Sequence, residues 1–418
     1  MGLFKQILDF LFSTKKEENI VSFLIGSGFS VADGLPLVRD INHRLSSIKE
    51  NEIMIHSEMS ALFLNGQENL NEWQRKEERI FIQEFLEFYC SEIVDGQDTF
   101  HYEDFFDFYS DFLRKGYEED DSPINLFCES FRKKHEGSLN VVDNYSLISN
   151  FHNTFNQLLG SLLQKAKYYE DITPFNYYPY DSFILFLKDL IEDNQIKVHT
   201  LNHDLLFERI CCVPPLWQEF SDGYYENGSP YYSYVEVPQP IKKKYRVRLK
   251  YFQNKFDKKI CLYKLHGSVD TYQFNIADQH KDLTRVKSDY GIEHRFVKEV
   301  RDPETGEYLY INGWQNSYPD FLSGTTTKML SYGNEFYEII FNYFKNNLIN
   351  SKLLIVIGYG FADAGINQYL EDFFLKAGKK MIVINPSKPK SDLMNYDVEV
   401  LEKKMQHVTY EEFSSMIK

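Results

Sequence analysis

The sequence is poor in cysteine, and its cysteines are badly spaced for a metal site. Five occur among 418 residues, at Cys90, Cys128, Cys211, Cys212 and Cys261. None stands in a Cys-x-x-Cys pair, the unit from which zinc ribbons are built. The sequence therefore predicts no metal centre, and it favours a cytoplasmic protein with reduced thiols.

Long apolar runs are also missing. A membrane-spanning helix needs roughly 18 uncharged apolar residues, and no run reaches that length. Residues Gly2 to Phe12 carry apolar side chains at helical spacing, which predicts a short docking helix. Asp9 interrupts this segment, and Gln6 stands where a myristoylation signal needs serine or threonine. We therefore expect no signal peptide, no lipid anchor and no membrane association.

Positive charge is in the minority. Lysine and arginine total 46 against 62 for aspartate and glutamate, and the formal net charge is -16. Such a surface repels phosphate backbones, so direct binding of nucleic acid is disfavoured. The one basic stretch, Lys242 to Lys250, alternates charged and apolar residues after Tyr245. This period of two predicts a strand at the edge of a sheet, and contact with an acidic partner or nucleic acid is the alternative.

Short apolar runs that end in a glycine or a polar turn recur along the chain. They lack the alternation of half-exposed strands, which is typical of parallel strands covered on both faces. Helical patterns lie between several of them, as at Tyr337 to Leu348 and Ile366 to Leu375. The sequence therefore predicts an α/β fold with a Rossmann-like parallel sheet. The expected strands are Ile20 to Ile25, Ile196 to Leu201, Ile260 to Leu265, Leu353 to Ile357, Lys380 to Ile384 and a further candidate, Val398 to Leu401.

The gap between the first two strands is far longer than a crossover needs. From about Ser46 to Ala166 it is charged and aromatic, with apolar residues at three and four spacing, which predicts a helical bundle. We therefore expect a sheet domain from residues 1–45 and 180–418 and a large inserted helical domain from residues 46–179. Residues 212–259 and 272–322, rich in tyrosine and glycine, predict loops and hairpins beside the sheet.

The first strand ends in a turn of small residues, Gly26-Ser27-Gly28-Phe29-Ser30, followed by Asp33 and Pro36. Such a turn lets backbone N–H groups approach a pyrophosphate, and a following helix would add its positive N-terminus. Val31 stands where the dinucleotide fingerprint has a further glycine. The motif fits phosphate binding, and a plain strand-to-helix turn accounts for it equally well.

Residues with catalytic chemistry follow the second and third strands. Asn202 and Asp204 can fix ribose hydroxyls and a water, or either can cap a helix through Leu205 to Phe207. His266, beside Gly267, can take a proton from a hydroxyl or a water, because imidazole titrates near neutrality. A structural histidine is the alternative there.

The fourth and fifth strands end in further candidates. Gly358-Tyr359-Gly360, Asp363 and Asn367 follow the fourth strand, and Asn385 ends the fifth. In a doubly wound sheet these ends form one rim, so the segments converge on one crevice. Their joint occurrence predicts a ligand site more strongly than any single segment does.

Together these segments resemble the sirtuin superfamily, specifically its divergent bacterial branch associated with antiphage defence. The first turn, with Gly34-Leu35-Pro36, resembles the Gly-Ala-Gly-x-Ser and Gly-Ile-Pro segments of that family. Thr200 to Asp204 resembles Thr-Gln-Asn-x-Asp, and His266-Gly267 is similar to the catalytic His-Gly. Gly358 to Asn367 is similar to Gly-Tyr-Ser-Phe-x-Asp-x-x-Ile-Asn, and Asn385 falls where sirtuins contact the adenosine ribose.

The resemblance implies that NAD, as substrate, lies over the first turn with its nicotinamide ribose between Asn202 and His266. It makes His266 the base, Asn202 the residue that orients ribose and water, and Asp204 a support, with Ser27 and Ser30 on phosphate or ribose. Sirtuin deacylases usually carry a zinc ribbon, which this sequence cannot build. We therefore expect an NAD hydrolase that yields nicotinamide and ADP-ribose. The alternatives are a protein deacylase or ADP-ribosyltransferase, and a noncatalytic NAD-sensing scaffold.

The resemblance also implies partners. Members of the branch act with sensor domains, Argonaute-like proteins or HerA-type ATPases, and this sequence has no recognisable sensor domain. An unrestrained NAD hydrolase harms the cell that makes it. We therefore expect a homo-oligomer, or a separate partner such as a HerA-type ATPase, to control an effector that defends against phage by depleting NAD. The helical insertion is the surface on which we expect that control.

Overall fold

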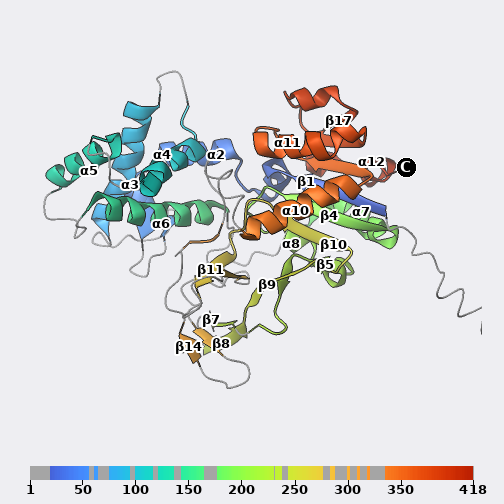
Figure 1. Ribbon diagram of the computed structural model, residues 1–418, viewed down its shortest axis with the longest axis horizontal. Coiled ribbons are helices and arrows are strands. Elements are labelled where there is room, and N and C mark those ends of the chain that lie inside the picture. The colour runs from blue at the N-terminus through green and yellow to red at the C-terminus, as the bar shows by residue number, and fades with distance from the viewer. Residues whose placement is uncertain are drawn as a thin grey trace, which may run out of the picture.

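The structure, a computed structural model, consists of a parallel-sheet domain, a helical domain beside it, and a group of antiparallel strands adjoining the sheet (Figure 1). The predicted docking helix at Gly2 to Phe12 lies outside the described residues. The described residues are 19–55, 61–64, 75–94, 99–115, 121–135, 143–163, 177–229, 231–237, 243–275, 283–287, 299–301, 308–310, 318–320 and 335–417.

The central sheet has seven strands, and every neighbouring pair in it is parallel. Its order is β17-β16-β15-β1-β4-β10-β5, so the chain builds outward from β1 on one side and later from β15 on the other. This doubly wound order confirms the predicted Rossmann-like fold. The strands are β1 (Asn19–Ile25), β4 (Asn194–Thr200), β5 (Phe220–Ser221), β10 (Ile260–Lys264), β15 (Leu353–Ile357), β16 (Lys380–Asn385) and β17 (Val398–Glu402).

Two cores cover the two faces of the sheet, which is why its strands read as continuous apolar runs. Phe23 of β1 packs in the core that contains α7 (Asp181–Asp193) and α12 (Tyr410–Ser415). Its neighbour Leu24 packs in the opposite core with α10 (Glu335–Asn350) and α11 (Ala364–Phe373). The six predicted strands and the two predicted helices are confirmed, each to within two residues at either end.

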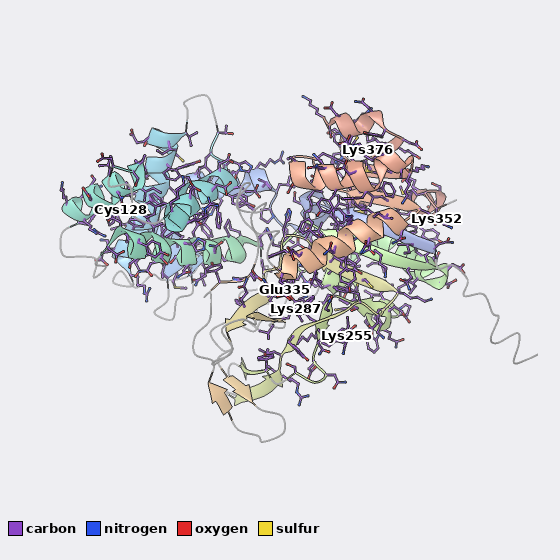
Figure 2. All side chains as sticks on the ribbon, viewed as in Figure 1. Cys128, Lys255, Lys287, Glu335, Lys352 and Lys376 are labelled. Atoms are coloured by element: carbon purple, nitrogen blue, oxygen red, sulfur yellow. The ribbon has the colours of Figure 1, made fainter. Side chains whose placement is uncertain are left out.

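The segment between β1 and β4 forms a helical domain with its own aromatic core, as predicted. Phe85 and Phe151, for example, pack edge to face with ring centroids 4.9 Å apart. Figure 2 labels Cys128 within this domain, where its thiol is buried. The domain contains α3 (Lys76–Phe88), a π-helical turn (Tyr89–Ile93), α4 (Tyr102–Lys115), α5 (Pro123–Lys134), α6 (Asn144–Leu163) and an unpredicted hairpin of β2 (Ile53–Ile55) and β3 (Ala61–Phe63).

Helix α2 (Val38–Ser46) belongs to the helical domain, so the boundary between the two domains lies before Val38 and not between residues 45 and 46 as expected. Its buried residues Ile41 and Leu45 pack with the aromatic core of the helical domain and not with the sheet. The turn after β1 is therefore followed directly by a helix that belongs to the neighbouring domain.

The antiparallel strands confirm the hairpins predicted for residues 212–259 and 272–322. One sheet holds β11 (Thr271–Asn275), β12 (Leu283–Lys287), β9 (Lys250–Lys255) and β6 (Gly223–Tyr225), and the other holds β14 (Tyr308–Tyr310), β13 (Glu299–Arg301), β7 (Tyr231–Val237) and β8 (Lys243–Arg248). Within the part of the chain that the structure describes, the basic strand β8 lies at the edge of its sheet, as predicted.

No helix in the described ranges has the length and apolar character needed to cross a bilayer.

Candidate active site

The loops after β1 and β15 interlock at the point where the sheet reverses direction. The N–H of Gly26 donates to the carbonyl of Ile357 at 2.9 Å, and the N–H of Gly28 donates to the carbonyl of Gly358 at 2.9 Å. A Cβ on Gly358 would lie 2.3 Å from the nitrogen of Phe29, and its φ is +67°. Only glycine tolerates this approach and this backbone conformation, so the two loops are held in direct contact.

The predicted phosphate turn differs from expectation. Ser27–Asp33 is a 3-10 segment, and the first α-helix, α2, begins only at Val38, so no helix N-terminus follows the turn directly. The N–H groups of Gly26, Gly28 and Phe29 all donate to protein carbonyls. The first two of these groups join the turn to the end of β15 and the loop after it, and the N–H of Phe29 closes the turn on Gly26.

The other residues predicted for this turn lie around it with different degrees of exposure. Ser27 and Pro36 are partly exposed, whereas Phe29, Ser30 and Asp33 are buried. The carboxylate of Asp33 lies 3.7 Å from Nη1 of Arg209. Of the two serines of this turn, Ser27 is thus the more accessible to a ligand.

The side chain of Asn202 ties the loop after β4 to the loop after β1. Its Nδ2 donates to the carbonyl of Gly26 at 3.1 Å and to the hydroxyl of Ser30 at 3.0 Å. Its backbone N–H donates to Oγ1 of Thr200 at 3.0 Å. The following helix, α8 (Leu206–Ile210), has Leu205 as its N-cap, so Asn202 does not cap it.

Asp204 has two partners. Its Oδ1 accepts the N–H of Leu206, the first residue of α8, at 2.9 Å. Because the N-cap of α8 is Leu205, Asp204 is not the N-cap that the alternative predicted. Its Oδ2 accepts the hydroxyl of Ser30 at 2.7 Å. Because the Ser30 hydroxyl also accepts from Asn202, the three side chains form one buried hydrogen-bonded chain.

His266 lies on the loop after β10, the strand next to β4, and its side chain is 5% exposed. Its Nε2 is 3.5 Å from Oδ2 of Asp363. The other oxygen of Asp363 accepts the N–H of Ile366 at 3.0 Å and so caps α11. The helix therefore fixes a carboxylate that faces the imidazole.

The other predicted residues brace the loop after β15. The hydroxyl of Tyr359 donates to Oδ1 of Asn367 at 3.0 Å, and Nδ2 of Asn385 donates to the carbonyl of Tyr359 at 2.7 Å. Burial, with Asp363 nearby, raises the pKa of Tyr359 well above its usual range. Gly360 is exposed, and a Cβ there would meet no atom within 4 Å among the described residues. Gly360 thus borders open space where a ligand could lie.

Two further residues belong to this frame, although the sequence did not single them out. The hydroxyl of Tyr180 donates to the carbonyl of Phe29 at 2.9 Å and supports the first turn from beneath. Lys264 ends β10, two positions before His266, and its ammonium group contacts both neighbouring loops. A charged residue closing an apolar strand was the one signal in the sequence that could have identified it.

In the described ranges, no group of three or more histidine, cysteine, aspartate or glutamate side chains could hold a metal ion.

Residues 197–408 match the SIR2-like domain family. The match covers just over half of the chain, from residue 197 within β4, and it includes β10, β15 and β16 with the polar loops that follow these four strands. The protein therefore belongs to the SIR2-like domain family. No curated protein matches the sequence.

Solved structures of Sir2 proteins are similar to this chain at low identity. A Sir2 homologue in complex with NAD is 11% identical with a TM-score of 0.34, over 99% of this chain and 93% of the other. A mutant Sir2 homologue in complex with ADP-ribose is 11% identical with a TM-score of 0.38, over 99% and 96%. A structure on the mechanism and regulation of Sir2 enzymes is 12% identical with a TM-score of 0.37, over 96% and 92%. Family membership rests on the sequence match.

Proposed function

We propose that this protein binds NAD at the rim formed by the loops after β1, β4, β10 and β15 and hydrolyses its nicotinamide–ribose bond. The observation that carries the proposal is that two polar groupings are built on the loops after neighbouring parallel strands, around the switch point between β15 and β1: the Asn202–Ser30–Asp204 chain and the His266–Asp363 pair. Open α/β sheets bind nucleotides at such a point. The choice of NAD as the ligand rests on the likeness of these loops to sirtuin motifs, in a chain of the SIR2-like family.

The chemistry of the bond determines what the site must do. Nicotinamide leaves with the bonding electron pair, which neutralises its pyridinium nitrogen, and positive charge develops at the anomeric carbon of the ribose. The oxygen of a water molecule then bonds to that carbon and loses a proton. The balanced reaction is NAD⁺ plus water giving ADP-ribose, nicotinamide and a proton.

The residues on the rim match these requirements. Nδ2 of Asn202 is held by the loop after β1, which leaves Oδ1 to orient a ribose hydroxyl or the attacking water. His266 takes the proton, and the carboxylate of Asp363 stabilises the imidazolium that results. Because Asn202 and Asp363 are fixed by hydrogen bonds before the substrate binds, little reorganisation of these two groups is needed during the reaction.

One incubation tests the proposal. Purified protein is mixed with NAD, with and without candidate partners, and nicotinamide and ADP-ribose are followed by chromatography. Asn202→Ala and His266→Ala are expected to slow release of nicotinamide by at least about 10²-fold. The matched control is Asn194→Ala, at the other end of β4, where the side chain donates to the carbonyl of Leu190 at 3.1 Å, away from the loops of the site.

The outcomes separate the alternatives. A protein deacylase or ADP-ribosyltransferase would release nicotinamide only when an acyl-lysine peptide or another acceptor is present, and a sensing scaffold would bind NAD without cleaving it. Intact NAD under every condition, or undiminished turnover in both site variants, would overturn the hydrolase.

We further propose that the protein is a cytoplasmic antiphage effector that depletes NAD, and that self-association or a partner such as a HerA-type ATPase controls it. The helical domain supports this proposal, because its helix α6 contacts a segment beside the site. Nε2 of His152 and the hydroxyl of Tyr318 are 2.8 Å apart, and the carbonyl of Asp320 accepts the N–H of Ser268 at 3.1 Å. A partner on the helical domain would thus be connected to the loop of His266.

A matched pair of surface variants tests this regulation. Leu126 on α5 is 55% exposed in the helical domain, and Leu185 on α7 is 51% exposed in the sheet domain. Leu126→Glu is expected to weaken assembly, measured by light scattering, and to change phage protection, whereas Leu185→Glu leaves both unchanged. Identical behaviour of the two variants would argue against control through the helical domain.

A further inference from the structure

Lys264 connects the two loops that carry the proposed catalytic residues. It is the last residue of β10 and lies opposite Thr200, the last residue of β4. Its Nζ donates to the backbone carbonyl of Asp204, lies 3.4 Å from the carbonyl of His203, and donates to Oγ of Ser268 at 3.0 Å. One ammonium group thus contacts the loop of Asn202 and the loop of His266 at the same time.

Charged side chains hold that ammonium group in place. The side chain of Lys264 is 10% exposed, and its Nζ is 3.1 Å from Oε1 of Glu208 on α8. The same Glu208 oxygen lies 3.4 Å from Nζ of Lys287, a residue of β12. The helix, the strand end and the neighbouring antiparallel sheet therefore share one ionic network.

The network closes on the loop of His266. Nζ of Lys287 lies 2.6 Å from Asp222 and 3.4 Å from Oδ2 of Asp270, and Oδ1 of Asp270 accepts the hydroxyl of Ser268 at 2.5 Å. Burial would lower the pKa of Lys287, but the surrounding carboxylates raise it well above its usual value. Lys287 therefore stays charged and anchors the outer side of the network.

The chemistry of lysine suits this place. An ammonium group has three donors around one point, and here it meets two carbonyls and a hydroxyl that arrive from two loops. A planar guanidinium fork cannot direct its donors at all three in the same way. Without the ammonium group, the carbonyls of His203 and Asp204 lose a buried donor and the two loops lose their shared contact.

We propose that Lys264 is a positioning residue that sets the spacing between Asn202 and His266. This inference rests on the proposed hydrolysis of NAD, since the spacing matters because one ribose must fit between the two side chains. A displacement of about 1 Å in such a site can slow the reaction by about 10²-fold. Lys264 itself touches no reacting atom in this scheme.

The experiment compares Lys264→Met with Lys259→Met. Lys259 directly precedes β10, so it lies at the amino end of the strand that Lys264 closes. Its ammonium group also contacts backbone carbonyls, those of Ile191 at 2.7 Å and Glu192 at 3.4 Å. Lys264→Met is expected to lower kcat by about 10²-fold while KM changes little, because the catalytic geometry changes more than ground-state binding. Lys259→Met keeps the wild-type kcat.

Lys264→Arg separates positioning from stability. Arginine keeps the ion pair with Glu208, so the melting temperature is expected to return to the wild-type value while kcat stays low. Equal recovery of kcat and melting temperature in this variant, or equal loss of kcat in Lys259→Met, would show that Lys264 only stabilises the fold and would overturn the proposal.

Amide hydrogen exchange tests the loop contact without any turnover. The N–H of Val269 donates to the carbonyl of His203 at 3.0 Å, and the N–H of Leu206 donates to Asp204. Both amides are expected to exchange faster in Lys264→Met than in Lys259→Met. If the wild-type protein leaves NAD intact, the proposed function fails, and exchange at these two amides still decides whether Lys264 joins the loops. Unchanged exchange in a folded Lys264→Met protein would contradict it.

Discussion

The hydroxyl of Ser30 donates a hydrogen bond to Oδ2 of Asp204 at 2.7 Å, across 174 positions of sequence. The same hydroxyl accepts a bond from Nδ2 of Asn202 at 3.0 Å. One small side chain on the loop after β1 thus holds both polar residues of the loop after β4. All three residues are buried, so a group that loses one of these hydrogen bonds cannot form a bond to water in its place.

Ser30→Ala removes the centre of this chain. We expect the free energy of unfolding to fall by about 1–3 kcal/mol, because two buried polar groups lose a partner, and we expect release of nicotinamide to slow. Urea denaturation and chromatography measure the two effects. Ser22→Ala is the matched control, since its hydroxyl makes a buried 2.6 Å bond with Ser351, the residue after α10, and Ser22 lies in the middle of β1 rather than on the loop. Ser22→Ala should lose similar stability and keep full turnover, and equal turnover in the two variants would contradict the role of Ser30.

Alanine at two nearby glycines should have opposite effects on folding and on binding. Gly358→Ala places a Cβ against the backbone of Phe29 at a φ of +67°, so we expect a strongly lowered melting temperature. Gly360→Ala meets no described atom within 4 Å, so the protein should fold normally and bind NAD more weakly if the substrate lies there. Calorimetry measures both quantities. A Gly358→Ala protein as stable as wild type would contradict the interlocked loops.

The two oxygens of Asp363 can be tested separately. Asp363→Asn keeps an N-cap acceptor for Ile366 but removes the charge that faces His266. We expect its melting temperature to stay close to wild type and its kcat to fall by about tenfold, since removing a charge partner is worth about 1.4 kcal/mol or more at a buried site. Asp363→Ala should add a stability loss of about 1 kcal/mol from the lost cap. Wild-type kcat in Asp363→Asn would show that the carboxylate serves only the helix.

Acid should destabilise the protein through His199, which lies fully buried against Tyr263. Burial, with the charge of Lys197 nearby, lowers the pKa of His199 to about 3. An unfolded histidine has a pKa of about 6.5, so below that pH the unfolded state binds a proton that the folded state refuses. The free energy of unfolding is therefore unaffected by His199 above about pH 6.5 and falls steadily as the pH drops from there toward 3. At pH 5 the loss is about 2 kcal/mol.

Urea midpoints at pH 7.5 and pH 5 check this expectation. His199→Phe should lose less stability between the two pH values than wild type does, whatever its absolute stability. His407→Phe, which replaces an exposed histidine, is the control and should behave as wild type. An unchanged pH dependence in His199→Phe would contradict the prediction.

The sheet could be predicted because parallel strands are buried on both faces. Leu353 to Ile357 is a continuous apolar run for that reason, and Val21 to Ile25 is apolar except for Ser22. The two-residue strand β5 and the β2–β3 hairpin could not be predicted in this way. Such short strands form because a partner strand lies beside them, and their own residues carry no recognisable period.

The candidate site was predictable as a set of residues but not as an arrangement. Asn202 and Asp204 both had a capping alternative, but Leu205 is the N-cap of α8. Asp204 instead accepts the N–H of Leu206 and the hydroxyl of Ser30, and Asn202 bonds the loop after β1. The glycines of the first turn were expected to present N–H groups to a phosphate, but those of Gly26 and Gly28 bond the loop after β15. Nothing in sequence spacing shows which carbonyl an N–H group will reach.

Sequence alone determined the type of sheet, the place of the helical insertion and the strand ends that carry polar residues, because these depend on local periodicity and on neighbours along the chain. Only the tertiary structure decided that Ser30 joins Asn202 to Asp204, that Asp363 faces His266, and that Lys264 links their loops. Those contacts depend on the order of strands in the sheet, which brings together residues that are far apart in sequence and have no pattern in common.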